Sequence, residues 1–273
     1  MSKSRFHTSC ESKIAIHNQL SQKCNFATSC GASTRCSKVS TEISCQPIPE
    51  TGALADNLNS NRDALVTRVG AEKAIVYCYV ISTIKNHNEY FCQTGSAPNF
   101  QGNLITLCTC KRYMRTFMKP EEWIGKWIAG FSGVAAGNGC NTIVYLMKVG
   151  HAFDSHQSFW LSREIPEETK QVKSADGNKF GDVYRPKEPL GDPYDPKSYR
   201  PPTKAHVHFA NKEWHRDINY RFRDRKDALL VGNSIYSFLW NKPMLLYKNG
   251  RIHRGQKKMY LSTLLDQLEE VGE

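Results

Sequence analysis

Residues 74–81 read Ala74-Ile-Val-Tyr-Cys-Tyr-Val-Ile81, a run of apolar, β-branched and aromatic side chains. Its length and composition predict a buried β-strand. Further strands are predicted at 104–110, 127–131, 142–149, 205–209, 227–231 and 234–240. Turns separate most of these runs, and helices are expected mainly at 155–160 and 263–271. This alternation favours a β-rich α+β fold, a barrel with peripheral helices, over a parallel sheet.

The chain before the first strand differs in composition. Residues 1–70 are rich in Ser, Thr, Asn and Cys, and they contain neither Trp nor Tyr. Such a segment offers little periodic apolar surface to a core. We therefore expect a weakly ordered N-terminal segment over 1–70, with a helix over 54–69, and one α+β domain over 71–273.

The ten cysteines include no CxxC pair, which disfavours a zinc ribbon or a thioredoxin-like site. No metal site is predicted from them, and Cys78 and Cys108 are expected to be small buried side chains in a reducing compartment. The sequence shows no secretory signal and no apolar run long enough to cross a membrane. We expect a cytoplasmic protein that does not bind membranes.

The formal net charge of +11 and the pI near 9.1 point to a polyanionic partner. Residues 197–226 carry nine Lys or Arg against three acids, and residues 248–258 carry five cations and no acid. Aromatic side chains in the first stretch would add base stacking to phosphate contacts. The alternatives are a solvated basic face or a surface that docks an acidic protein. The predicted phosphate contacts are Lys111, Arg112, Arg115, Arg216, Arg221 and Arg223.

A second set of residues would suit catalysis. His206 and His208 share one face of a predicted strand, and His215 and Asp217 follow as H-x-D, an order similar to the facial triad of iron oxygenases. Cys110 precedes two cations that would lower the pKa of its thiol. The runner-up function is therefore an enzyme that modifies a base or nucleotide, with a metal held by the His/Asp cluster. The residues alone do not decide between binding and catalysis, and they name no cofactor.

Residues 133–139, Gly133-Val-Ala-Ala-Gly-Asn-Gly139, form a glycine cluster. A nucleotide-binding glycine loop leads from a strand into a helix, whose N-terminal amides hold the phosphate. These glycines lead from one predicted strand into another, and the Lys-Ser/Thr of a Walker loop is missing. The cluster therefore predicts a hairpin connection.

The order of short motifs along the chain resembles the second class of nucleotide-modification-associated domains, over about 75–265. The motifs are Tyr77-Cys-Tyr-Val80, Gly95-Ser-Ala-Pro-Asn99, Leu107-Cys-Thr-Cys-Lys111, Trp127-Ile-Ala-Gly130, Ile143-Val-Tyr-Leu-Met-Lys-Val149, Gly181-Asp-Val-Tyr-Arg185 and Arg216-Asp217 before Leu229-Leu-Val231. The family is similar to accessory parts of systems that hypermodify DNA bases. The resemblance implies a protein that binds nucleic acid, DNA in particular, or a modified nucleotide, alongside other proteins of such a system.

The chain departs from the family where Gly125-Lys-Trp127 replaces a common Gly-Asp-Trp. If that acid were catalytic, this chain would lack the activity. The stretch 123–149 is also similar to the PUA-like barrel core of proteins that flip a modified base into a pocket, which requires a stacking aromatic and edge hydrogen bonds. Trp127, Tyr145 and Asn99 are the expected pocket residues, with core packing and turn capping as the alternative.

Overall fold

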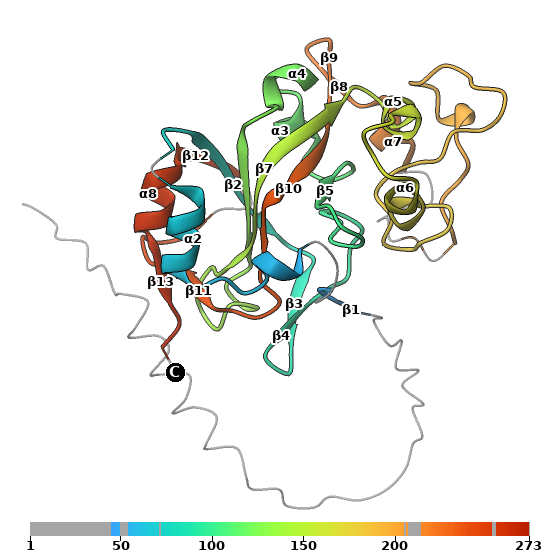
Figure 1. Ribbon diagram of the computed structural model, residues 1–273. Helices are drawn as coiled ribbons and strands as arrows, with labels where there is room; N and C mark the ends of the chain where they lie inside the picture. Colours follow the sequence, from blue (N-terminus) through green and yellow to red (C-terminus); the bar gives the residue numbers. More distant parts are fainter. Residues whose placement is uncertain are drawn as a thin grey trace, which may run out of the picture.

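The computed structural model describes residues 45–49, 54–70, 72–204, 206, 214–252 and 255–272. A six-stranded sheet runs through its centre in the order β12-β2-β6-β7-β10-β5 (Figure 1). The strands are β2 (Ile75–Ile81), β5 (Thr106–Leu107), β6 (Trp127–Ser132), β7 (Ile143–Phe153), β10 (Leu229–Leu239) and β12 (Gln256–Tyr260). β2 and β6 pair in parallel, and the other neighbours pair antiparallel.

β2 is buried on both faces of this sheet, as its composition predicts. Tyr79 and its alternate neighbours pack into one cluster, whereas Cys78 and its alternate neighbours pack into another. The second face is covered by α2 (Arg62–Val69) and α8 (Leu261–Asp266), which lie together in Figure 1. The first face is covered by Met114 of α3 (Arg112–Arg115) and Trp123 of α4 (Pro120–Trp123).

Smaller elements surround the central sheet. β1 (Gln46–Pro47), β4 (Tyr90–Gln93) and β3 (Ile84–His87) form one small sheet, and β11 (Leu245–Tyr247) with β13 (Leu268–Glu270) forms another. A disulfide joins Cys45 to Cys92 beside β1. β8 (Arg221–Phe222) and β9 (Arg225–Lys226) form a hairpin. The remaining elements are η1 (Ala55–Asn57), α5 (His156–Leu161), α6 (Glu167–Lys173), η2 (Pro196–Ser198) and α7 (Trp214–Asn219).

The strand-rich mixed fold agrees with the sequence prediction, but the described sheets do not close into a barrel. The two strands predicted at 227–231 and 234–240 are one strand, β10, whose pairing is irregular between Val231 and Ser237. The strand predicted at 104–110 is reduced to β5, and the predicted C-terminal helix ends at Asp266, where β13 follows. Most of the strand predicted at 205–209 lies outside the described residues. None of the described helices is long and apolar enough to cross a membrane.

Part of the polar N-terminal segment belongs to the core. Leu54 is buried against one face of the sheet, and Leu65 and Val69 of α2 are buried against the other. The helix predicted over 54–69 is confirmed in part, as the short η1 followed by α2, and its apolar residues dock it onto the sheet. Residues 1–44 lie outside the described residues, so the division of the chain at residue 70 stays a prediction.

The close contact between Gly130 and Tyr145 gives a stability prediction. These residues are cross-strand neighbours in β6 and β7, and a Cβ at position 130 would overlap the Tyr145 ring. Gly130→Ala is therefore expected to lower the free energy of unfolding by about 1–3 kcal/mol in urea denaturation, because overpacking forces neighbours off their preferred rotamers. The control is Gly133→Ala, where no atom lies within 4 Å of the added Cβ. Equal midpoints for the two variants would contradict the prediction.

Candidate functional site

The basic residues after Cys110 and those at 216–226 meet at one end of the molecule. The first group forms α3, and the second forms α7 and the β8–β9 hairpin (Figure 1). Arg112 Nη1 lies 3.1 Å from Asp217 Oδ1, and Arg225 Nη1 donates to the Phe117 carbonyl at 2.8 Å. Two stretches that are distant in sequence therefore build one region, which has a buried interior and an exposed rim.

A fully buried ion pair anchors this region. Arg115 Nη2 lies 2.8 Å from Asp227 Oδ2, and both side chains have no exposed surface. The same guanidinium donates to the carbonyls of Ala228 and Cys110 at 2.6 and 2.8 Å. Lys226 Nζ lies 2.9 Å from the other oxygen of Asp227. The prediction that Arg115 contacts phosphate is therefore wrong: its charge is used to tie α3 to β9 and β10.

Asp217 is the second buried carboxylate of the region. Its carboxylate accepts a hydrogen bond from Arg112 on one oxygen and a second from the Tyr184 hydroxyl, at 2.9 Å, on the other. Burial raises the pKa of Asp217 to about 7, and this effect exceeds the lowering by Arg112 and by the Tyr184 hydrogen bond. A carboxyl group that titrates near neutral pH can give or take a proton, which is the behaviour of a general acid or base.

Tyr184 links Asp217 to a buried histidine. Its backbone amide donates to His156 Nδ1 at 3.2 Å, and the two rings lie 4.8 Å apart. Burial lowers the pKa of His156 well below its usual range, and the charges of Lys226 and Arg115 lower it further. The imidazole is therefore neutral at physiological pH. Sequence reasoning missed both roles, although Tyr184 belongs to the motif at 181–185.

Two further buried charged residues, Asp182 and Lys173, lie near β5. Asp182 accepts hydrogen bonds from the Thr106 hydroxyl at 2.8 Å and the Cys108 amide at 3.1 Å, and burial raises its pKa to about 6. Lys173 Nζ donates to Asn99 Oδ1 at 2.9 Å, and burial lowers the pKa of this lysine to about 8. These residues hold the loop before β5 in place. No sequence signal marked Lys173.

The base pocket expected from Trp127, Tyr145 and Asn99 does not form. Trp127 is fully buried and its Nε1 donates to Glu72, while the Tyr145 hydroxyl lies 2.8 Å from that of Tyr79 inside the core. Asn99 is also buried, and its Nδ2 donates to the Phe180 carbonyl at 2.8 Å. The pocket prediction is corrected to core packing, because all three side chains are satisfied inside the protein.

Cys110 is not the activated thiol that its neighbours suggested. Arg115 and Lys111 do lower the pKa of the thiol, but burial outweighs them and raises it to about 11. The thiol therefore stays protonated at neutral pH, which disfavours a nucleophilic role. Lys111 itself is half-buried, with its Nζ 4.8 Å from the centre of the Tyr79 ring.

The histidine cluster is placed only in part. His206 lies with its ring 6.2 Å from that of Tyr184, and His215 packs against Trp214 at 4.3 Å. His208 lies outside the described residues. Within the ranges that the structure describes, no three His, Cys, Asp or Glu residues are grouped so that they could hold a metal ion. A metal site that involves His208 stays a prediction.

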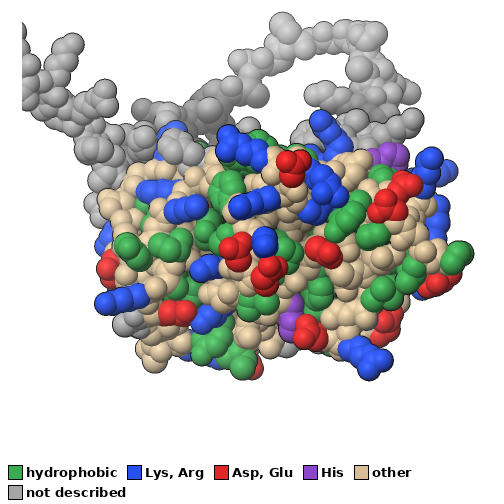
Figure 2. All heavy atoms as spheres, turned by 90° about the horizontal axis from the view of Figure 1, so that it is seen from above, with side chains coloured by type: hydrophobic (Ala, Val, Ile, Leu, Met, Phe, Trp, Pro, Cys, Tyr) green, Lys and Arg blue, Asp and Glu red, His purple; other side chains and the backbone are tan. Residues whose placement is uncertain are grey.

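Above the buried residues lies an exposed surface of cations and aromatic rings, called the hairpin surface below. Its residues are Tyr113, Phe117, Tyr194, Arg221, Phe222, Arg223, Arg225 and Lys258. Figure 2 looks onto this end of the molecule, where Lys and Arg side chains are interleaved with hydrophobic ones and with acids.

Rings and cations are in direct contact on the hairpin surface. Phe222 and Tyr113 meet edge to face at 4.8 Å and are 37% and 47% exposed. Arg223 lies 5.3 Å from the Phe222 ring, and Arg221 lies 4.9 Å from the Tyr194 ring. Of the predicted phosphate contacts, Arg221, Arg223 and Arg216 are exposed. Lys111 and Arg112 are half-buried.

The raised pKa of Asp217 makes the free energy of unfolding depend on pH. Between pH 3.8 and about 7 its carboxyl ionises in the unfolded chain but keeps its proton in the folded protein, so stability falls as pH rises through this window. Asp217→Asn stays uncharged, so it should gain stability relative to the wild type by at most about 1.4 kcal/mol per pH unit from pH 5 to 7. Urea denaturation at each pH measures this difference. The control is the exposed Asp224→Asn, and a difference for Asp217→Asn that does not change with pH would contradict the prediction.

Comparison with known proteins identifies a family that the chain matches. The model of the family described as nucleotide modification associated domain 2 matches residues 73–222, more than half of the chain. The matched span contains α3 with the cysteines and cations next to it, and the motif at 181–185 that includes Tyr184. It also contains Asp217 and the first strand of the hairpin, β8. No curated protein and no solved structure matches the chain.

Proposed function

The chain belongs to the nucleotide modification associated domain 2 family, and from this premise we propose that it binds nucleic acid, DNA in particular, in a base-modification system. The observation that carries the proposal is the hairpin surface. Its exposed guanidinium groups suit phosphate, and its exposed rings suit the faces of unpaired bases. The net charge of +11 would draw a polyanion toward the protein as a whole.

The buried interior supports this role by holding the hairpin surface in one arrangement. The Arg115–Asp227 pair ties α3 to the strand that leaves the hairpin. The pairing of Arg112 with Asp217 ties α3 to α7, the helix that leads into it. A hairpin fixed in this way loses less backbone freedom when it binds a ligand than a loose loop would.

Fluorescence anisotropy with labelled oligonucleotides tests the proposal. The wild-type protein is titrated into duplex and single-stranded DNA at several salt concentrations. We expect log K to fall linearly with log salt, with a slope of about −0.9 for each phosphate contacted in duplex DNA. Phe222→Ala should weaken single-stranded binding more than duplex binding, because a stacked base contributes about 1–3 kcal/mol. Absence of binding to duplex, single-stranded and modified DNA at low salt would overturn the proposal.

A specific observation also favours a second function, an enzyme that modifies a base or nucleotide. Asp217 and His156 are buried and each forms a hydrogen bond with Tyr184, and both have displaced pKa values. The buried Asp182, two residues before Tyr184, also has a raised pKa. Displaced pKa values of this kind are concentrated at catalytic sites. Incubation of the protein with DNA, followed by mass spectrometry of the digested nucleosides, tests for a new base. Activity that Asp217→Asn abolishes while DNA affinity is kept would establish the enzyme.

A further inference from the structure

A pocket of about 570 Å³ opens far from the hairpin surface, at the carboxyl ends of the parallel strands β2 and β6. Val80 and Ser82 line it where β2 ends, and the glycine loop at 133–136 lines it where β6 ends. The volume falls within the range of about 300–1,000 Å³ that is typical of small-molecule sites.

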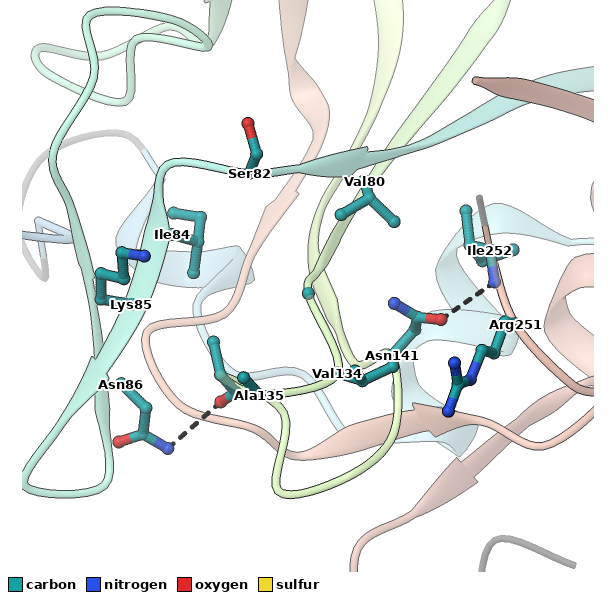
Figure 3. Close-up of a pocket in the computed structure, with 12 residues that line it drawn as sticks. Val80, Ser82, Ile84, Lys85, Asn86, Val134, Ala135, Asn141, Arg251 and Ile252 are labelled. Carbon is teal, nitrogen blue, oxygen red and sulfur yellow. Dashed lines mark hydrogen bonds between the residues drawn. The ribbon is translucent and has the colours of Figure 1, made fainter. Parts of the chain in front are cut away.

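The charged groups of this pocket are all positive. Lys85 of β3 lies on one side of it and Arg251, which follows β11, lies on the other (Figure 3). Both side chains are exposed, and neither forms an ion pair with an acid of the described chain. No acidic residue lines the pocket. Two cations without acidic partners in one concave site favour an anionic ligand.

The pocket wall is held in place by hydrogen bonds of its own. Asn141 Nδ2 donates to the Ser132 carbonyl at 2.7 Å, and Asn141 Oδ1 accepts from the Ile252 amide at 2.9 Å. This second bond fixes the segment that carries Arg251. On the opposite side, Asn86 Nδ2 donates to the Ala136 carbonyl at 3.2 Å, which ties β3 to the glycine loop (Figure 3). Hydrogen bonds therefore hold the backbone next to each of the two cations in place.

Apolar side chains complete the lining. Val80, Ile84, Val134 and Ile252 contribute hydrophobic surface between the two cations. A small inorganic anion would leave this surface uncovered. An organic phosphate with a flat, weakly polar ring would cover it, and the volume suits a ligand of nucleotide size.

We propose that this pocket binds a nucleoside monophosphate that spans it from side to side. The phosphate is held by one of the two cations, Lys85 or Arg251, the base lies against the apolar wall between them, and the other cation donates to polar atoms of the base or sugar. The proposal rests on the pocket itself and does not require DNA to bind the hairpin surface. It also gives a role to Arg251, which belongs to the acid-free basic stretch at 248–258. From this stretch the hairpin surface includes Lys258. The glycine loop contributes as a wall between strands, in agreement with its prediction as a hairpin connection.

Isothermal titration calorimetry with the four deoxynucleoside monophosphates tests the proposal on the full chain. At least one nucleotide is expected to bind at least tenfold more tightly than its nucleoside and than inorganic phosphate. Lys85→Ala and Arg251→Ala should each weaken it tenfold or more, whereas the matched control Lys248→Ala, which lies outside the pocket, should not. Ser82→Trp should block the pocket without removing a charge.

Three outcomes would overturn the proposal. One is equal affinity for nucleotide and nucleoside, and another is an unchanged affinity in both the Lys85→Ala and Arg251→Ala variants. The third is nucleotide binding that is lost in Asp217→Asn but kept in Lys85→Ala, which would place the ligand beside Asp217 and Tyr184 instead. The oligonucleotide titrations of the same variants separate the two proposals, because loss of cations from the pocket is expected to leave DNA affinity within about twofold.

Discussion

Asp227→Asn is expected to lower the free energy of unfolding by about 3–5 kcal/mol, the largest stability effect that we predict for this protein. The substitution keeps the shape of the side chain but removes its charge. Arg115 would then be left as a fully buried cation, and Lys226 would lose the same partner. A buried charge without compensation is far more costly than a buried pair or a buried apolar contact. Urea denaturation at neutral pH measures the loss.

The chain offers a matched control three residues earlier. Asp224→Asn makes the same chemical change in the exposed turn of the hairpin, where the residue has a φ of 62° that Asn tolerates well. Its effect should stay within about 0.5 kcal/mol. The double variant Arg115→Met/Asp227→Leu should be more stable than Asp227→Asn, because it removes both charges. A loss below about 1 kcal/mol in Asp227→Asn would show that the pair is not the anchor of α3.

Replacing Arg221, Arg223 and Arg225 together with Gln is expected to weaken binding of duplex DNA roughly a hundredfold to a thousandfold at low salt. If each guanidinium contacts one phosphate, the slope of log K against log salt should become shallower by about 2.7. All three side chains are exposed, and the hydrogen bond of Arg225 to the Phe117 carbonyl lies at the surface, while the buried Arg115–Asp227 pair is untouched. The fold should therefore be kept, and circular dichroism and thermal unfolding check this. Fluorescence anisotropy over a salt series measures the slope.

A second triple variant separates local contact from net charge. Arg68, Lys242 and Lys248 are exposed cations on α2 and around β11, away from the hairpin (Figure 1). Their replacement with Gln changes the net charge by the same amount. We expect its salt slope to stay close to that of the wild type. Equal weakening by the two triple variants would mean that only the overall field attracts DNA, and that the hairpin surface is not the interface.

The Asp227→Asn variant and the triple Gln variant probe the buried interior of the site and its exposed rim separately. If Asp227→Asn loosens α3 and the hairpin, DNA affinity should fall even though no exposed cation has been removed. The Gln variants should show the reverse pattern, with affinity lost and stability kept. The two measurements together therefore assign each charge near the hairpin either to support of the surface or to contact with the ligand.

The sequence alone determined the local elements and the family. β2, β6 and the first part of β7 could be predicted because their apolar, β-branched and aromatic residues fill both faces of a strand. The family was recognisable from short motifs, because their order along the chain can be read without any knowledge of contacts. The basic runs were also visible, since a net charge requires only a count.

Only the tertiary structure decided which charged and aromatic residues are available to a ligand. Arg115 and Arg221 look alike in sequence, yet one is fully buried and the other is exposed. The difference arises because Arg115 meets Asp227 and Ala228, the latter 113 positions away, through the pairing of distant elements. The same holds for Trp127, which is buried in the core, and for Asp217, whose pKa is raised by burial against the opposing effects of Arg112 and Tyr184. Which charged and aromatic side chains are buried depends on long-range packing, and the residues next to them in the sequence do not encode it.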